Sequence, residues 1–299
     1  MYTRALVMGL AFTIMWSSAF TSARVIVADA SPLYALSLRF LISGILGVAV
    51  ATLVGQSWKL SKSQWKATAL FGLCQNSLYL GLNFIAMRTV EAGLATIIAS
   101  TLPLLVALTS FLFFRERLTL LAIVGLVAGF SGVTVIMGSR ISAGVDLYGV
   151  SLCVMGVLAL TFATLTLRGA TSSGDYLMVV GLQMLVGSSA LFVAALLFEV
   201  PYFSPSWSLA VAFTYSTLVP GLAATLVWFY LVNRIGATRA ATFHFLNPFI
   251  GVLIAAIILN ESLGVGDYIG VTIVTCGILA VQIARQRIEK NAVKPVVQK

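Results

Sequence analysis

Ten runs of mostly apolar residues divide this chain of 299 residues. A helix needs roughly 20 apolar residues to cross the hydrocarbon core of a bilayer. Only helices and closed barrels can span it, because every backbone polar group must find its partner inside the protein. We therefore predict an all-α integral membrane protein with ten transmembrane helices. The spans are expected near residues 5–23, 33–54, 67–87, 92–114, 120–137, 147–167, 177–198, 208–231, 240–259 and 267–284.

The composition excludes a soluble protein, because only 9% of the residues are charged and 60% are hydrophobic. Soluble domains carry roughly 25% charged residues. The net charge of +9 comes from basic residues in short connections and in a C-terminal tail, which favours membrane orientation over nucleic-acid binding. The three cysteines lie within apolar runs and are expected to pack rather than form disulfides. No cluster of zinc-ligand type is present, and we expect neither a metal nor a cofactor.

One helix-length segment occurs twice, 145 positions apart. Leu94–Glu116 and Arg239–Glu261 are both apolar, with one interior proline and one terminal glutamate. Five pairs keep this offset, which indicates an internal duplication; they are Pro103/Pro248, Glu116/Glu261, Leu118/Leu263, Gly125/Gly270 and Gly132/Gly277. We predict one five-helix repeat over residues 1–140 and a second over 141–287. A basic cytoplasmic tail, expected to be disordered, follows over 288–299. The first apolar run could pass for a signal peptide, but the first repeat needs it as a helix.

The distribution of lysine and arginine predicts the orientation of these helices. With a cytoplasmic N-terminus, fourteen basic residues fall on the inside and only Arg24, Arg88 and Arg140 on the outside. The positive-inside rule therefore predicts that both termini are cytoplasmic, in the inner (plasma) membrane. Because five is an odd number, the second repeat enters the membrane from the opposite side. Inverted repeats of this kind give many transporters two exchangeable access states.

The repeated motifs resemble a known family. In each repeat a mid-helix proline is followed by the sequence Glu-x-Leu. One glycine lies nine residues after the glutamate, and a second glycine lies seven residues after the first. The two copies, each beginning one residue before the glutamate, read RERLTLLAIVGLVAGFSGV and NESLGVGDYIGVTIVTCGI. This pattern, with the Pro32…Leu38-Arg39-Phe40 opening of the second span, resembles the EamA-type unit of the drug/metabolite transporter superfamily over nearly the whole chain. The resemblance implies ten helices, a central substrate cavity and, commonly, export of amino acids or related metabolites. The arginines that flank Glu116 are absent around Glu261.

Two interior prolines are candidate gating kinks. Proline removes a backbone donor and frees the carbonyl four residues earlier, and such breaks at matching positions of two repeats point to a binding site. Pro103 and Pro248 are therefore expected to kink their helices beside the cavity, with packing as the alternative.

His244, the only histidine, shares a helix face with Asn247. We expect both to line the cavity, with an interhelical hydrogen bond as the alternative.

Polar and aromatic residues at membrane depth complete the predicted substrate site. In the third span, side chains at helical spacing form a polar stripe, and the first span carries a tryptophan and serines near mid-membrane. Thr161 and Trp228 are the repeat partners of Trp16 and Asn83. Such a mixture of aromatic, amide and hydroxyl groups suits a small amphipathic solute, although packing explains each residue singly almost as well. The predicted substrate-binding residues are Trp16, Ser17, Gln75, Tyr79, Asn83, Thr161, Trp228, His244 and Asn247.

The charged residues narrow the substrate class. Arg39, about two turns into its helix, is expected to snorkel to the interface or form an ion pair rather than hold a substrate carboxylate. Glu116 and Glu261 are expected to cap the helices that follow them. All nine acidic residues fall in loops, at helix ends or in the tail, which disfavours a cation/proton antiporter that needs a carboxylate within the membrane. Nor is there a basic cluster suited to phosphate.

Together these features predict a transporter, not an enzyme. It would export small neutral or zwitterionic metabolites, foremost large apolar or aromatic amino acids, by alternating access, with a facilitator driven by the solute gradient as one form of this mechanism. Export of other metabolites or drugs with proton coupling is the alternative. A rhomboid-like protease is a remote one, because the GxSG pattern of Gly129–Gly132 is already explained by the repeat. The expected partners are the solute and the lipid bilayer, with the chain as a monomer or homodimer.

Overall fold

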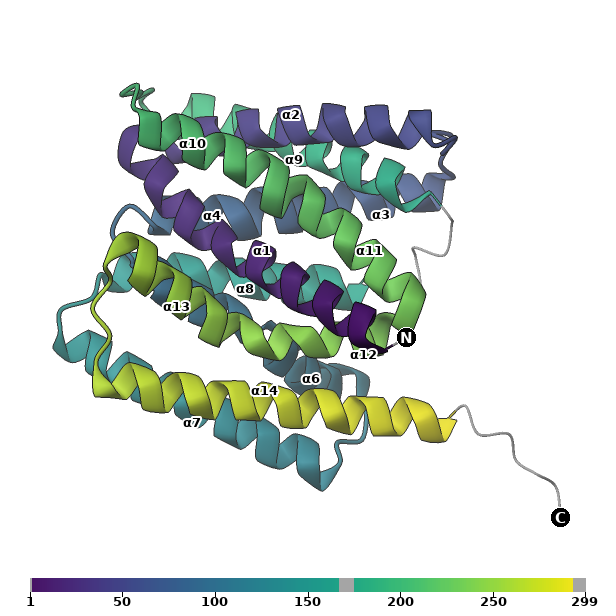
Figure 1. Cartoon of the computed structure of the whole chain (residues 1–299), viewed down its shortest axis with the longest axis vertical. Helices are drawn as coiled ribbons and strands as arrows, with labels where there is room; N and C mark the ends of the chain where they lie inside the picture. The colour runs from purple at the N-terminus through teal and green to yellow at the C-terminus, as the bar shows by residue number, and fades with distance from the viewer. Residues whose placement is uncertain (1, 167–174, 293–299) are drawn as a thin grey trace, which may run out of the picture.

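A computed structural model describes residues 2–166 and 175–292 of the chain, and within these ranges all regular structure is helical (Figure 1). Ten helical stretches are long and apolar enough to cross a membrane, which confirms the predicted number. They are Thr3–Asp29, Pro32–Leu53, Lys62–Ala86, Ala92–Phe114, Leu120–Ser142, Leu147–Leu165, Tyr176–Phe198, Trp207–Val232, Arg239–Leu259 and Val265–Ile288. Residue 167, the predicted end of the sixth span, and residues 293–299 of the predicted tail lie outside the described residues.

Several spans consist of more than one helical element. The elements are α1 (Tyr2–Asp29), α2 (Pro32–Leu53), α3 (Lys62–Phe71), η1 (Gly72–Tyr79), α4 (Leu80–Ala86), α5 (Ala92–Ser100), α6 (Leu102–Phe114), α7 (Leu120–Ser142), α8 (Leu147–Thr166), α9 (Tyr176–Phe198), α10 (Trp207–Ser216), η2 (Thr217–Ala223), α11 (Ala224–Ile235), α12 (Ala237–Ala241), η3 (Thr242–Leu246), α13 (Asn247–Leu259) and α14 (Val265–Ala292). The last helix continues to Ala292, so the first part of the predicted disordered tail is helical.

Two spans contain π-helical segments at equivalent positions. Segment η1 begins at Gly72 and η2 begins at Thr217, which are 145 positions apart like the sequence motifs. Segment η2 contains Pro220, whose missing N–H is incompatible with a regular α-helix. Single π-helical turns inside α-helices are frequent at functional sites. The apolar pattern of the sequence did not predict these segments, because a change in hydrogen-bond register leaves the composition of a span unchanged.

The prolines Pro103 and Pro248 lie where helices restart. Each occupies the first turn of its helix, α6 or α13, where the missing N–H would have had no intrahelical partner. A 3₁₀ segment, η3, precedes α13, and the N–H of Asn247 reaches the His244 carbonyl. The helices therefore break at both prolines, and the freed carbonyl of His244 is taken up locally. Their role in gating stays a prediction.

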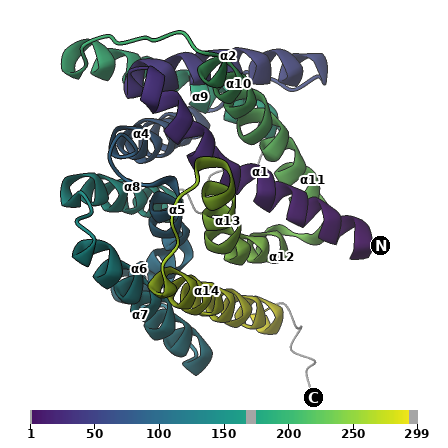
Figure 2. The same ribbon diagram turned by 60° about the vertical axis from the view of Figure 1, so that its left-hand side comes forward.

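Helices from the two halves of the chain pack in pairs. Helix α7 lies along α14, and α2 lies along α9; Figures 1 and 2 show these pairs on opposite sides of the bundle. The first pair is in backbone contact, since a Cβ at Gly277 would lie 2.5 Å from the Gly129 nitrogen and 2.6 Å from the Gly125 oxygen. In the second pair, Gly47 packs on Gly181. Small residues let helices approach closely in lipid, where apolar burial provides little attraction.

The two ends of the bundle differ. The start of α1 and the end of α14 lie at one end, which we call the terminal end (Figure 1). The opposite end, called the far end, carries the α1–α2 turn and the connections that precede α5, α8, α10 and α14.

The α7–α14 contact gives a direct test of the fold. Gly277→Ala should lower the melting temperature in detergent, because its methyl group would overlap the α7 backbone, and overpacking typically costs about 1–3 kcal/mol. Gly138→Ala is the matched control, since a Cβ there meets nothing within 4 Å. Equal melting temperatures for the two variants would contradict the close contact.

Candidate functional site

A cavity of about 550 Å³ lies among the helices of both halves. It reaches Gln64 and Ala67 in the first turns of α3, and Tyr176 at the start of α9, which is 36% exposed. These residues belong to the terminal end, and none of the described lining residues belongs to the far-end connections. The cavity therefore extends from the middle of the bundle toward the terminal end.

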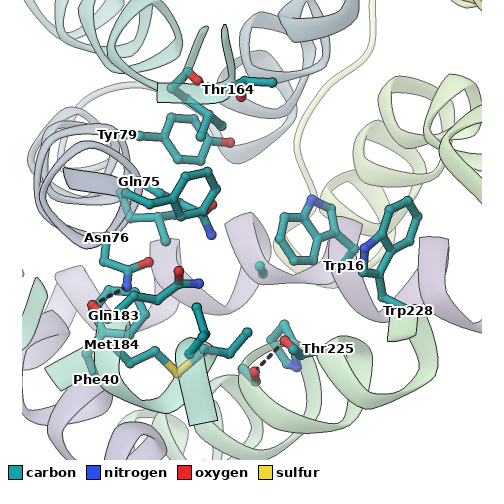
Figure 3. A pocket seen from close by; sticks show the side chains of 18 of the residues that line it. Trp16, Phe40, Gln75, Asn76, Tyr79, Thr164, Gln183, Met184, Thr225 and Trp228 are labelled. Carbon is teal, nitrogen blue, oxygen red and sulfur yellow. Dashed lines mark hydrogen bonds between the residues drawn. The ribbon is translucent and has the colours of Figure 1, made fainter. Parts of the chain in front are cut away.

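One wall of the cavity is polar and is built by the π-helical segment η1. Figure 3 shows Gln75, Asn76 and Tyr79 with Gln183 of α9 on one side. The Asn76 side-chain amide donates to the Gln183 carbonyl at 3.0 Å, and Gly187 packs against Asn76. This hydrogen bond joins the two halves of the chain beside the cavity.

The facing wall is aromatic. Trp16 and Trp228 lie together across the cavity from the polar wall (Figure 3). The Phe12 ring centroid is 5.6 Å from that of Trp16 and 4.8 Å from that of Trp228. The His244 ring stands edge-on to Phe12 at 5.2 Å and lies 5.1 Å from Trp228. Such a cluster offers flat apolar surface and ring faces to a bound molecule.

Five of the nine predicted substrate-binding residues line this cavity. They are Trp16, Gln75, Tyr79, Trp228 and His244. The structure thus brings together side chains from four predicted spans, the first, third, eighth and ninth. Whether they bind the substrate stays a prediction.

The other four predicted residues make packing contacts instead. Asn83 donates to the Tyr79 carbonyl at 2.7 Å, and Thr161 to the Val157 carbonyl at 2.8 Å, each within its own span. Asn247 lies 2.9 Å from Nδ1 of His244, and Ser17 contacts the Asn247 carbonyl at 3.4 Å. Asn247 thus orients the histidine, and its contact with Ser17 joins α1 to α13; an interhelical hydrogen bond was the alternative considered for Asn247 and His244.

Sequence reasoning missed Arg39 as a cavity residue. The expected snorkelling is wrong, because Arg39 is only 5% exposed and lines the cavity. The expected ion pair is absent too, since no described carboxylate lies within salt-bridge distance of it. Burying a charge without a partner is costly, so its depth, two turns into α2, was the signal that could have identified it. Other lining residues were also missed, among them Gln183, Met184, Thr164 and Thr225.

The far end is closed by charged contacts between helices. Arg140 donates to both Asp267 oxygens at 3.1 and 3.0 Å and to Glu91 at 2.5 Å. Glu199 accepts from the backbone N–H of Leu33 at 3.0 Å and thereby caps α2. The Asp146 carboxylate accepts from Thr89, and this hydrogen bond lowers its pKa.

Glu261 caps a helix other than the expected one. Its oxygens accept from the N–H groups of Ala92 and Gly93 at 2.7 and 2.9 Å, so it caps α5 of the first half rather than the following α14. Burial raises the pKa of this carboxyl, and the two backbone hydrogen bonds oppose that shift. At the start of α7 the Thr119 side chain accepts from the Ala122 N–H at 3.3 Å, and the capping role of Glu116 stays a prediction.

The remote protease alternative gains no geometric support. Ser131 is exposed on α7, and Gly132 beside it packs against the Gly270 oxygen of α14. His244 lies in the cavity among aromatic rings, with its Nδ1 bonded to Asn247. The described contacts of this histidine include no serine hydroxyl.

Comparison with known proteins agrees with this architecture. The EamA-like transporter family model matches residues 3–138 and 147–282. The uncharacterized transporter YvbV of Bacillus subtilis is 26% identical over 270 residues, 90% of this chain and 88% of that protein. An uncharacterized transporter of Archaeoglobus fulgidus is 27% identical over 91% of this chain and 96% of its own length. A solved crystal structure shares the fold, with a TM-score of 0.65 and 20% identity over 95% of this chain and 99% of its own.

The extent of the cavity predicts which side chains water can reach. Thr164→Cys lines the cavity, whereas Thr96→Cys is buried in α5 away from it. In a chain whose native cysteines are replaced by alanine, a small water-soluble thiol reagent should label the cysteine at position 164 at least about tenfold faster than the cysteine at position 96. A tenfold ratio corresponds to a difference of about 1.4 kcal/mol in the free energy of exposing the thiol to the reagent. Mass spectrometry follows the labelling, and equal rates at the two positions would contradict the described cavity.

Proposed function

Since this chain belongs to the EamA-like transporter family and is a membrane transporter, we propose that it exports small neutral or zwitterionic metabolites, foremost amino acids with large apolar or aromatic side chains. This family membership confirms the resemblance drawn from the repeated motifs. The observation that carries the proposal is the cavity of about 550 Å³, with an aromatic wall facing a polar amide wall. Cavities of a few hundred Å³ that are mostly apolar, with a few placed polar groups, are typical sites for small molecules.

The transport mechanism that we favour is alternating access by two inverted repeats. Its support is a pair of contacts at opposite ends of the α2–α9 pair, whose donors, Leu33 and Met178, keep the 145-residue offset while their acceptors are 143 positions apart. At the far end Leu33 donates to Glu199, which follows α9; at the terminal end Met178 donates at 3.0 Å to the side-chain oxygen of Gln56, which follows α2. Exchange of such equivalent arrangements between two repeats would move the opening from one end to the other.

The proposed orientation places the terminal end in the cytoplasm. Most basic residues near the helix ends belong to this end, including Lys59 before α3 and Lys62 and Lys66 in its first turns, as the positive-inside rule requires. The chain would then lie in the plasma membrane with both termini inside. A cavity that extends toward the cytoplasm would be the loading state of an exporter.

The lining also supports a facilitator rather than a cation/proton antiporter. No aspartate or glutamate is found among the described lining residues. A carboxylate at membrane depth is the group that would bind a cation and a proton in turn. Without one, the concentration gradient of the solute is the proposed driving force.

Reconstitution tests the proposed function directly. Purified protein in liposomes should carry labelled phenylalanine, leucine or tryptophan down a concentration gradient, at a rate that a pH gradient leaves unchanged. Empty liposomes are the control. Transport of organic cations without transport of any amino acid would refute the substrate class, and strict dependence on a pH gradient would refute the facilitator mechanism.

The far-end contacts provide a test of alternating access. Arg140→Gln should open the far end more often, because it leaves the carboxylates of Asp267 and Glu91 facing each other without their shared cation, and breaking a buried ion pair is strongly destabilising. Labelling of Thr96→Cys should then rise at least about tenfold. Arg88→Gln, which changes an exposed arginine at the same end, is the control and should leave labelling unchanged. An unchanged rate in well-folded Arg140→Gln would argue against an ionic closure.

A further inference from the structure

The substrate cavity contains a buried cation with unused hydrogen-bond donors. Arg39 of α2 is 5% exposed, and its Nε donates to the Ser216 carbonyl at 3.2 Å. A guanidinium carries five N–H donors, and those on Nη1 and Nη2 donate to no described residue. No described carboxylate pairs with this charge.

The local fold holds this guanidinium in place. Pro220 has no N–H, so it cannot donate to the carbonyl four residues earlier, which is that of Ser216. In the π-helical register of η2 the N–H of Gly221, five residues on, reaches this carbonyl instead, and the Arg39 Nε donates to the same oxygen. On its other side, Arg39 lies over the Phe40 ring, with Cζ 5.3 Å from the centroid. The π-helical segment η2 and a neighbouring aromatic ring therefore orient the side chain while leaving the Nη donors unbonded.

Only the first half of the chain contributes a charged side chain to the described lining of the cavity. The repeat partner of Arg39, 145 positions later, is Met184, which also lines the cavity but carries no charge. Besides Arg39, the described lining has no other arginine, lysine or acidic side chain. A bound solute therefore meets one fixed positive charge and no fixed negative charge.

From these observations we infer that Arg39 binds the carboxylate of the transported solute and thereby makes the cavity selective for organic carboxylates. A carboxylate fits the planar fork of a guanidinium with two parallel hydrogen bonds. The apolar body of the solute would then lie against Trp16 and Trp228. An ammonium group would find amide and hydroxyl oxygens and ring faces but no carboxylate among the described lining residues, so the amino group of an amino acid would contribute less to recognition than the carboxylate. This inference rests on the proposed function and adds the chemical group that is recognised.

Three probes of one size test this assignment by binding to the purified protein. They are phenylalanine, 3-phenylpropionate, which lacks the amino group, and phenylalaninamide, which lacks the carboxylate. Calorimetric titration of the wild type should show that 3-phenylpropionate binds at least as tightly as phenylalanine. Phenylalaninamide should bind about 10- to 100-fold more weakly, the range expected for hydrogen bonds to a charged group.

Substitution of Arg39 should remove this preference. Arg39→Met installs the residue found at the repeat partner. It should weaken the binding of phenylalanine and 3-phenylpropionate about 10- to 100-fold and leave the binding of phenylalaninamide unchanged. Arg39→Lys keeps the charge without the fork and should be intermediate. Arg88→Met, at an exposed site outside the cavity, is the control and should bind like the wild type.

The possible outcomes separate this assignment from the proposed function. Equal binding of all three probes to the wild type, or no binding of any, would overturn the assignment, and this test needs no variant to fold. Amino-acid flux in liposomes that is unchanged in Arg39→Met would also overturn it while leaving the proposed function standing. Arg39-dependent binding of 3-phenylpropionate without flux of any amino acid would support the carboxylate site and refute the amino-acid exporter.

Discussion

The need to satisfy every backbone hydrogen bond without water governs this fold. In a bilayer an unpaired carbonyl or N–H costs several kcal/mol, so a spanning segment can depart from the α-helix only where another group replaces the lost partner. The segment η2 illustrates this rule. Pro220 cannot donate to the Ser216 carbonyl, so the chain shifts to a π-helical register in which the N–H of Gly221 does so. The Arg39 side chain donates to the same carbonyl oxygen, so the irregular segment also provides an acceptor for a buried cation.

The same rule explains where the irregular segments lie. Segments η1 and η2 both contribute to the cavity, through Gln75 and Tyr79 in one and Pro220 and Gly221 in the other. Their starting residues are 145 positions apart. Irregular backbone at membrane depth is tolerated where it is buried in protein or lines a cavity. Duplication of one unit therefore provides two irregular segments for one central site.

Sequence reasoning could predict the features that depend on local composition. The number of spans and the prolines at helix restarts follow from apolar length and backbone chemistry, and Trp16, Tyr79 and His244 were selected because polar and aromatic groups at depth face the interior. It failed where the outcome depends on a partner distant in sequence. Arg39 was assigned to the interface because snorkelling is the general behaviour near a helix end, and its acceptor is 177 positions away.

Helix capping shows the same limit. Glu261 was matched to the helix that follows it, but in the folded bundle the start of α5 lies within reach of its carboxylate. Glu199 similarly caps α2 from the end of α9. Neither pairing has a signature in the local sequence, because a carboxylate can accept from any helix start that packing brings to it. Only the three-dimensional arrangement of the repeats identifies these partners.

The two halves are similar in backbone but different in chemistry, and this difference has a mechanistic consequence. The α2 start is capped by the carboxylate of Glu199 at the far end, and the equivalent α9 start by the neutral amide of Gln56 at the terminal end. Hydrogen bonds to charged groups contribute about 1.5–3 kcal/mol, against about 0.5–1.5 kcal/mol for neutral pairs. On the proposed mechanism, the charged cap would therefore hold α2 against α9 more firmly at the far end than the neutral cap does at the terminal end. In an alternating-access cycle, the solute must interact more strongly with the state that opens there, because a ligand shifts a conformational equilibrium only through its differential affinity for the two states.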